Sequence, residues 1–309
     1  MSKQTDIKEP SGVLIVNKHA GATSHDIVNR IRRLYGTRRV GHTGTLDPMA
    51  TGVLVILIGR AAKADEYLTT ASKRYRATLR LGITTDTEDT TGTVLSTSEK
   101  IPSCADLQAI LSQFRGKIQQ IPPMYSALKV NGQKLVDLAR QGVTVERKPR
   151  EIEIFELTAT PTDTPTDYIL DVCCSGGTYI RTLCADIGAA LGCGGAMATL
   201  ARTEAGGFPL TLAHTVEELV AMEEAERQEL LIPTESLFAD CPSVKLPAFY
   251  EKLCRSGCEI YQKKIGTQHA VGERVRICDQ HGAFFALGEV REYENGTAIK
   301  AIKTFSLND

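Results

Sequence analysis

The longest apolar run of this chain, Val53 to Ile58, constrains its fold more than any other sequence feature. Its length fits a strand that is buried on both faces and is far too short to cross a bilayer. A second strand is expected over 75–81, where apolar residues alternate with polar ones. Apolar residues recur at helical spacing over 27–34 and 180–191, and Thr23 or Ser24 can cap the first of these helices. Strands and helices are therefore expected to mix along the chain.

The length of the chain and the positions of its glycines and prolines indicate more than one domain. A chain of 309 residues exceeds the usual length of one domain. Short β-rich runs with glycines near their turns dominate the last part, which predicts a small separate β domain over 244–309 after a main domain over 10–243. Prolines bound the basic segment 122–150, which we interpret as an inserted subdomain or mobile arm.

Composition excludes several protein classes. The amino-terminal residues Met1 to Asp6 lack the apolar core of a signal peptide, so we expect a cytoplasmic protein. The nine cysteines are scattered and odd in number, which argues against a disulfide framework and favours reduced thiols. Cys254 and Cys258 lack a second closely spaced pair, and the acidic loop at 86–92 lacks calcium-loop spacing, so no metal site is expected.

The formal net charge of −1 conceals an uneven distribution. Residues 115–150 contain eight Lys or Arg and two acids, and residues 18–39 contain six basic residues and one acid. Residues 217–229, in contrast, contain six Glu and one Arg, within an acidic helix that is expected near 216–230. This pattern is compatible with a basic phosphate-binding face opposite an acidic one. Ordinary solvated helix faces would account for it equally well.

One carboxylate stands out by its local surroundings. Asp47 precedes Pro48, which favours an extended backbone, and it lies in a loop with Gly41, Gly44 and Gly52. Such a loop ahead of a rigid buried strand can present a carboxylate as a nucleophile or a base. Taken alone, however, an Asp-Pro pair in a glycine-rich loop is most often an ordinary turn.

Several segments taken together favour the catalytic interpretation. The loop His42 to Leu54 closely resembles the catalytic loop of the pseudouridine synthases. More narrowly, the chain resembles the TruB family, the bacterial enzymes that isomerise uridine 55 in the T-loop of tRNA. Asn17 and Gly177 are small departures from that family's pattern. Further segments match in the family's order: Lys18 with Gly21 to Ser24, Lys73 to Tyr75, Leu81 to Gly82 with Thr85 to Thr87, Pro123 to Lys129, Cys174 to Arg181, and Leu200 to Thr203.

The resemblance implies a fold and a set of partners. It implies an α+β (mixed α/β) catalytic domain on a largely antiparallel sheet, with 122–150 as an inserted RNA-binding arm. The segment 244–309 would be a small PUA-like, β-barrel-like domain. The expected partner is the T-arm of tRNA, without a membrane or an obligate protein partner, and the expected state is a monomer. Assistance to tRNA folding is an additional expected role.

The implied reaction limits the chemistry that the site must supply. Pseudouridine formation breaks the N1–C1′ bond, turns the base and joins C5 to C1′. No redox step and no net hydrolysis occur, so no cofactor is expected. Asp47 can attack C1′, add to C6 of the uracil, or take a sugar proton, and the sequence leaves these routes open.

The resemblance also assigns partners to Asp47. Burial raises the pKa of a carboxyl group, so a cation should keep it ionised, and Arg181 is expected to be that cation. Tyr75 is expected to stack on an extruded uracil, with its hydroxyl near C5 as a proton acceptor. Leu200 would form the opposite apolar wall.

The remaining candidate residues concern RNA binding. His42 is expected to occupy the vacated stack or contact neighbouring bases, and Tyr179 to pack near the base or position Arg181. Arg202 joins the substrate-binding set through its matched segment. Phosphate contacts are expected from Lys18, Lys63, Arg74, Lys129, Lys134 and Arg140.

Two other functions remain possible at this stage. An RNA-binding folding factor would use the basic surfaces without needing a buried carboxylate. A nucleosidase would release free uracil and leave an abasic site. The joint presence of Asp47, Tyr75 and Arg181 favours the isomerase over the folding factor.

Overall fold

The computed structural model describes residues 9–68, 72–130 and 132–306. The amino-terminal segment Met1 to Asp6, from which a cytoplasmic location was predicted, lies outside these residues. No helix in the described part of the chain is long and apolar enough to cross a membrane.

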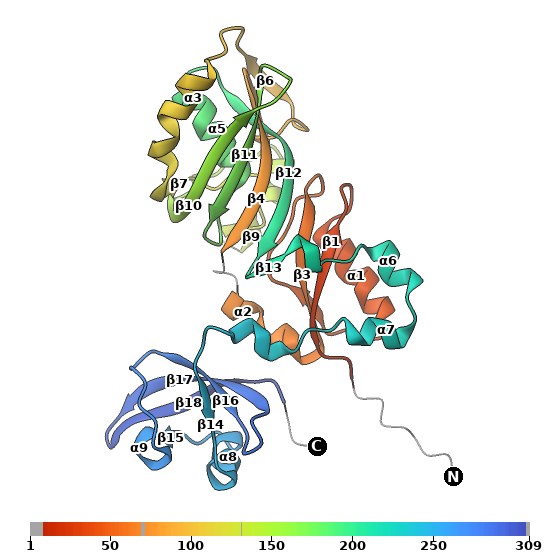
Figure 1. The fold of residues 1–309 in the computed structure, drawn as a ribbon. Helices are drawn as coiled ribbons and strands as arrows, with labels where there is room; N and C mark the ends of the chain where they lie inside the picture. The colour runs from red at the N-terminus through yellow and green to blue at the C-terminus, as the bar shows by residue number, and fades with distance from the viewer. Residues whose placement is uncertain (1–8, 69–71, 131, 307–309) are drawn as a thin grey trace.

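The main body is built on one large sheet. Within the described residues, its nine strands are β1 (Gly12–Lys18), β2 (Val40–His42), β3 (Thr51–Ile58), β4 (Lys73–Leu81), β7 (Gly116–Gln120), β10 (Arg150–Pro161), β11 (Asp167–Cys174), β12 (Gly195–Ala205) and β13 (Phe208–Pro209). The main order is β1-β3-β12-β4-β11-β10-β7, with β2 beside β3 and β13 beside β12 (Figure 1). Strands β3 and β12 run parallel, and the other paired neighbours run antiparallel. The predicted largely antiparallel sheet is therefore confirmed.

The sequence patterns explain the central strands. All six apolar residues from Val53 to Ile58 are buried, as expected for a strand covered on both faces. In β4 the alternation places Tyr75 and Leu79 inside, whereas Arg76 and Arg80 pair with acids of β11 on the outer face. The two faces of β4 thus differ, because one packs in the core and the other forms cross-strand ion pairs.

Helices flank the large sheet and occur in both parts of the chain. They are α1 (Ser24–Leu34), α2 (Asp65–Leu68), α3 (Cys104–Ile110), α4 (Leu135–Arg140), α5 (Ile180–Ala190), α6 (Val216–Ala221), α7 (Glu224–Glu229), α8 (Ala248–Arg255) and α9 (Gln262–Ile265). Short 3-10 helices are η1 (Gly59–Ala64), η2 (Leu111–Phe114), η3 (Leu210–Leu212) and η4 (Thr234–Phe238). The predicted start of α1 is confirmed, because Thr23 and Asp26 form a capping box there.

The expected acidic helix over 216–230 is wrong as a single element. It is divided into α6 and α7, because Met222 leaves the helical conformation and Glu223 begins a new capping box with Glu226. The Glu226 carboxylate accepts from the Glu223 N–H at 2.8 Å, which satisfies a free N–H group at the start of the second helix.

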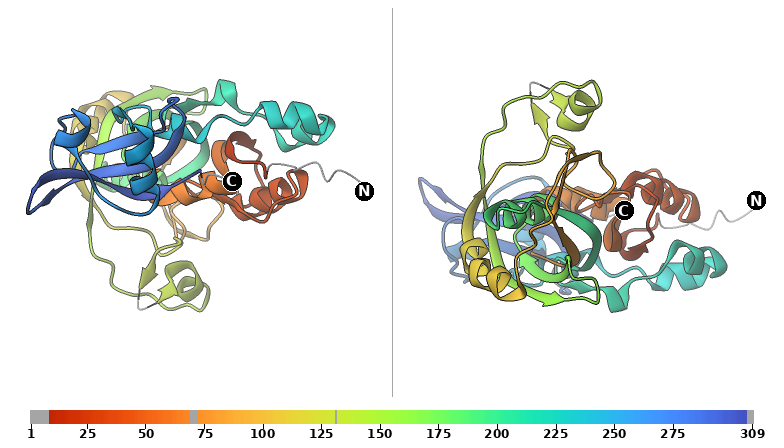
Figure 2. Two further views of the ribbon diagram at one scale, coloured as in Figure 1. Left: turned by 90° about the horizontal axis from the view of Figure 1, so that it is seen from below. Right: turned by 90° about the horizontal axis from the view of Figure 1, so that it is seen from above.

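In the described part of the chain, two small hairpins extend from the body. The first is formed by β5 (Ile83–Thr85) and β6 (Val94–Thr97), and the second by β8 (Lys129–Val130) and β9 (Gln133–Lys134). The second hairpin and α4 belong to the segment 122–150, which projects from the body as a separate arm (Figure 2). The inserted position predicted for this segment is thus confirmed, and its movement on RNA binding stays a prediction.

The carboxy-terminal part forms a second, curled sheet, consistent with a PUA-like domain. Among the described residues, its five strands follow the order β14 (Ser243–Lys245), β16 (Arg274–Cys278), β17 (Phe284–Tyr293), β18 (Gly296–Thr304) and β15 (Ile260–Tyr261). The boundaries 10–243 and 244–309 stay a prediction.

Aromatic packing fixes the curled sheet against the main body. Phe238 lies in one buried cluster with Phe284 and Phe305, at ring-centroid distances of 5.9 and 5.5 Å. Tyr67 of α2 packs on the same cluster, and the Lys63 ammonium donates to the carbonyl oxygen of Thr304 at 3.1 Å. Burial of several aromatic rings makes this a shared apolar core rather than a loose linker contact.

Candidate active site

Asp47 lies in the loop between β2 and β3, and buried polar contacts hold this loop in place. The Ser24 hydroxyl donates to the carbonyl oxygen of Leu46 at 3.1 Å and accepts from the Leu46 N–H at 2.9 Å. The Ala50 N–H donates to the Asp47 carbonyl oxygen at 3.0 Å. The backbone on both sides of Asp47 is therefore tied down.

The end of this loop requires a glycine. Gly52 has φ +97°, and a Cβ atom there would lie 2.2 Å from the carbonyl oxygen of Arg202. Any side chain would push β3 away from β12 at the only parallel contact between described strands of this sheet. The glycine-rich character of the loop is thus needed for strand contact as well as for the turn.

The carboxylate of Asp47 forms an ion pair with Arg181 of α5. Nε of Arg181 lies 2.9 Å from Oδ2 of Asp47, and Nη2 donates to Oδ1 at 3.4 Å. The Arg181 side chain is 6% exposed, whereas that of Asp47 is 36% exposed. The arginine is therefore buried behind the carboxylate, which remains accessible on its other side.

Further partners surround the Arg181 guanidinium. Nη1 donates to the carbonyl oxygen of Thr87 at 3.1 Å and lies 3.7 Å from a carboxylate oxygen of Asp89. Nη2 donates to the carbonyl oxygen of Tyr125 at 2.8 Å, in the arm. This arrangement fixes the guanidinium plane from several directions, which preorganises it for Asp47.

Opposing effects set the pKa of Asp47. Burial raises the pKa of this carboxyl above the ordinary range, and the charge of Asp89 raises it further. The charge and hydrogen bond of Arg181 and the charge of Lys18 act against this rise. A carboxylate with a raised pKa is a better base and nucleophile than a solvated one, provided that it remains ionised.

An apolar surface adjoins the carboxylate. Leu46 and Ala50, on either side of Asp47 in the chain, lie in one buried cluster with Tyr75 and Leu200. Burial strongly raises the pKa of Tyr75, a hydrogen bond with Arg202 lowers it and the charge of Asp47 raises it, so the phenol is neutral near pH 7. The structure therefore brings Asp47, Arg181, Tyr75 and Leu200 to one region, and their roles in the reaction stay a prediction.

Arg202 is enclosed by the protein, unlike a side chain that binds RNA at the surface. Its side chain is 2% exposed, and it donates to the carbonyl oxygens of Val53 at 2.7 Å and Gly44 at 3.0 Å. Nearby, Nδ1 of His42 accepts from the Gly44 N–H at 3.3 Å, and burial and the charge of Arg202 lower the His42 pKa. A neutral, half-buried His42 suits contact with bases, whereas Arg202 supports the loop from behind.

Lys18 is also placed behind the loop, contrary to the predicted phosphate contact. Its side chain is fully buried, and its ammonium donates to the carbonyl oxygens of His19, Pro48 and Ala50 at 2.9, 3.2 and 2.6 Å. Burial lowers its pKa to about 8. We correct the prediction because a phosphate cannot reach an enclosed ammonium, and this one instead holds the backbone that follows Asp47.

Tyr179 immediately precedes α5 and is half-buried. Its N–H donates to Oε1 of Gln120 at 2.9 Å, and its carbonyl oxygen accepts from Nε2 of Gln120 at 3.0 Å. Burial raises the pKa of the Tyr179 hydroxyl. Its position two residues before Arg181 fits the predicted positioning role.

The predicted phosphate contacts are dispersed over the surface. Arg74 pairs with both carboxylate oxygens of Glu156 on the outer face of the sheet, at 2.8 and 2.9 Å. Lys129, Lys134 and Arg140 are exposed on the arm. The arm thus presents predicted phosphate contacts to solvent, whereas Arg74 is engaged by an acid.

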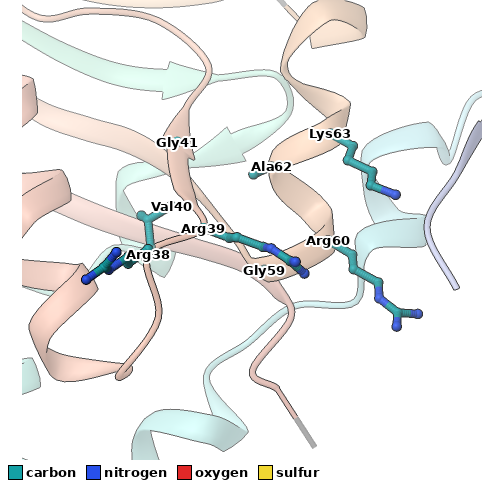
Figure 3. Close-up of a pocket in the computed structure, with 8 residues that line it drawn as sticks. All are labelled: Arg38, Arg39, Val40, Gly41, Gly59, Arg60, Ala62 and Lys63. Atoms are coloured by element: carbon teal, nitrogen blue, oxygen red, sulfur yellow. The ribbon is translucent and has the colours of Figure 1, made fainter. Parts of the chain in front are cut away.

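Lys63 lies in a basic cavity of about 680 Å³ (Figure 3). Arg38 and Arg39 line it from the segment before β2, and Arg60 and Lys63 from the 3-10 helix that follows β3. Asp47 precedes the opposite end of β3, and an eight-residue strand spans about 25 Å. The cavity is therefore not the pocket for a target base, but its charge suits an RNA phosphate.

Several contributing residues had no assigned role in the sequence interpretation. Asp89 and Gln120 are buried polar residues beside matched segments, and Lys73 is a buried lysine inside one. A clue was available for Lys73, because it stands at an inward position of the β4 alternation. For Asp89 and Gln120 no local pattern separates them from exposed neighbours.

Comparisons with known proteins address the identity of the chain. Residues 32–180 match the family described as TruB family pseudouridylate synthase (N terminal domain). Residues 181–239 match the tRNA pseudouridylate synthase B C-terminal domain. Together these matches cover the site around Asp47 and Arg181.

Curated relatives agree over most of the chain. A tRNA pseudouridine synthase B of Thiobacillus denitrificans is 45% identical over 280 residues, which is 90% of this chain and 91% of the relative. The protein of that name from Haemophilus influenzae is 38% identical and covers 94% of each chain.

A solved structure supports the same fold. The crystal structure of a Cbf5-Nop10-Gar1 complex contains a similar chain with a TM-score of 0.74 and 26% identity, covering 96% of this chain and 85% of that one. The combined matches, over a fold with the expected sheet and site, show that this chain belongs to the TruB family of tRNA pseudouridine synthases, which are isomerases.

Proposed function

We propose that this enzyme converts uridine 55 in the T-loop of tRNA to pseudouridine, with Asp47 acting on an extruded nucleotide. The observation that carries the proposal is the half-exposed Asp47 carboxylate, held from behind by the buried Arg181. Tyr75 and Leu200 lie in the adjoining apolar cluster and suit an uncharged base. Extrusion of the base from its loop costs roughly a few kcal/mol, which binding contacts must offset.

The site residues have distinct proposed roles. Asp47 supplies the nucleophile or base, and Arg181 keeps it ionised in an apolar site. The neutral Tyr75 stacks on the uracil and relays the C5 proton, because its hydroxyl gives up its own proton to water as it accepts the new one. His42 contacts the bases beside the vacated position. Attack at C1′, addition at C6 and removal of a sugar proton all require this ionised carboxylate, so the proposal includes each route.

The proposal is tested by incubating the purified enzyme with unmodified tRNA transcripts and mapping pseudouridine at nucleotide resolution. We expect modification at position 55 alone. A transcript in which uridine 55 is replaced by cytidine is the matched control and should remain unmodified. Modification at another position would contradict the assigned target while leaving the family assignment intact.

The basic cavity is proposed to hold backbone phosphates of the same tRNA, outside the target loop. Its cations come from two chain segments that meet at one end of β3. Phosphate contacts supply affinity without reading sequence and release counterions when they form. Binding by such a surface should therefore weaken with salt.

Replacing Arg60 with Ala tests the cavity. We expect weaker tRNA binding and a slope of log affinity against log salt that is shallower by about 1, as expected for the loss of one phosphate contact. Fluorescence anisotropy at several salt concentrations measures both quantities. Lys100→Ala removes an exposed cation elsewhere and is the control. Equal slopes for the two variants would show that the cavity does not contact tRNA.

A further inference from the structure

Gln120 is a buried polar residue outside the chemistry described above. It is the last residue of β7, and its side chain is 2% exposed. Both polar atoms of its side-chain amide form hydrogen bonds with the backbone of Tyr179. Oε1 accepts from the Tyr179 N–H at 2.9 Å, and Nε2 donates to the Tyr179 carbonyl oxygen at 3.0 Å. A paired contact of this kind fixes the orientation of the Tyr179 backbone as well as its distance.

The contact lies where α5 begins. The first N–H groups of a helix have no partner inside it and are commonly satisfied by a capping side chain. Tyr179 stands at the capping position with an extended backbone, and its side chain makes no capping hydrogen bond. Its carbonyl oxygen already accepts the first helical bond, from the Leu183 N–H at 3.0 Å. Gln120 of β7 therefore holds the Tyr179 backbone in place, as a capping side chain within the helix would do.

This constraint acts on the first turn of α5, which carries Arg181. The Arg181 guanidinium must meet Asp47 in a plane set by contacts at 2.9 and 3.4 Å. A rotation of the first turn would move the guanidinium relative to the carboxylate and open the longer contact first. Pairs of this geometry lose their two-point character with small displacements.

We propose that Gln120 is a positioning residue for catalysis, which sets the start of α5 so that Arg181 reaches Asp47. The inference rests on the proposed roles of Asp47 and Arg181. Only Ile121 separates Gln120 from the arm segment 122–150, so the same amide joins the base of the arm to the active site. If the hydrogen bonds of Gln120 served only to hold β7 beside the start of α5, their loss would lower stability but would not change the reaction rate of the folded enzyme.

The chain offers a matched pair of substitutions for the test. Gln119 is the exposed neighbour of Gln120 in the same strand, so Gln119→Ala makes the identical change without removing the contact. For Gln120→Ala we expect the single-turnover rate to fall about 10- to 100-fold, as for a small misplacement of catalytic groups. Affinity for tRNA should remain within about twofold, because the basic surfaces are unchanged. Gln119→Ala should match the wild type in both measurements.

Gln120→Glu makes the reaction rate depend on pH in a way that is not expected if Gln120 only stabilises the fold. When ionised, the introduced carboxylate still accepts from the Tyr179 N–H but cannot donate to the Tyr179 carbonyl oxygen, whereas the protonated form does both. Burial should raise the pKa of this introduced carboxyl group. The rate of Gln120→Glu relative to wild type should therefore increase as the pH falls from about 8.5 to about 6, through the raised pKa.

The outcomes separate this inference from the proposed function. A Gln120→Ala rate within twofold of wild type, or a Gln120→Glu ratio that does not change with pH, would overturn the positioning role. These results are read only against wild-type enzyme assayed in parallel. Absence of pseudouridine with the wild type itself would instead overturn the proposed function.

Discussion

Replacing Asp47 with Asn should abolish pseudouridine formation while tRNA binding stays close to that of the wild type. The amide preserves the size of the side chain but can neither attack carbon nor accept a proton as a carboxylate does. Loss of a nucleophile or base of this kind lowers rates by at least roughly 10³-fold. Pseudouridine formation under single-turnover conditions and tRNA affinity by filter binding are the two measurements.

The control for this substitution is Asp163→Asn, which makes the same change at an exposed carboxylate in the β10–β11 connection. It should leave both measurements unchanged. If Asp47→Asn forms pseudouridine at the normal rate, the catalytic assignment is wrong. Retained binding without catalysis would separate the reaction from any contribution of the protein to tRNA folding.

Mass spectrometry of the wild-type product distinguishes isomerisation from base release. Conversion to pseudouridine leaves the mass of the RNA unchanged, because no atom is gained or lost. A nucleosidase would release free uracil and leave a lighter RNA with an abasic site. The same samples therefore test the reaction class as well as the role of Asp47.

Replacing Arg181 should have the second largest effect, and two variants divide its contributions. Arg181→Lys keeps a positive charge but loses the planar pairing with Asp47 and the bonds to backbone carbonyl oxygens, so the rate should fall about 10²-fold. Arg181→Met also removes the charge, and its rate should fall by roughly 10³-fold or more. Single-turnover rates over a range of pH measure both effects.

The pH dependence of these variants follows from the raised pKa of Asp47. Only the ionised carboxylate reacts, so the wild-type rate should decline as the pH falls through a pKa above the ordinary carboxyl range. Arg181 opposes this rise through its charge and hydrogen bond. Its removal should raise the pKa further and shift the acid limb to higher pH, with a larger shift for Met than for Lys.

An exposed bidentate pair on the outer face of the sheet provides the control. Arg76 contacts both oxygens of Asp171 at 2.9 and 3.2 Å. Arg76→Lys should leave the rate and the acid limb unchanged, because an exposed pair contributes little and lies away from Asp47. An unshifted acid limb in Arg181→Met would contradict the electrostatic role of Arg181.

Local sequence patterns were sufficient to predict the strands and the helix start that surround the site. The run Val53 to Ile58 is a fully buried strand, the alternation over 75–81 lies within β4, and Thr23 caps α1 as expected. These predictions succeeded because apolar periodicity and capping act between residues close in the chain. Identification of Asp47 as a candidate needed more, namely the resemblance of several ordered segments to one family.

The sequence by itself determined the strands, the caps and the residue types available to the site, whereas tertiary structure decided which charges are buried. Lys18 and Arg202 look like surface cations in the sequence, but the fold encloses both behind the catalytic loop. Gln119 and Gln120 are identical neighbours on opposite faces of β7, and only the tertiary structure, which places Tyr179 beside Gln120, decides which of the two is buried. The physical reason is that desolvation and hydrogen bonding of such groups depend on elements distant in sequence, which no local pattern records.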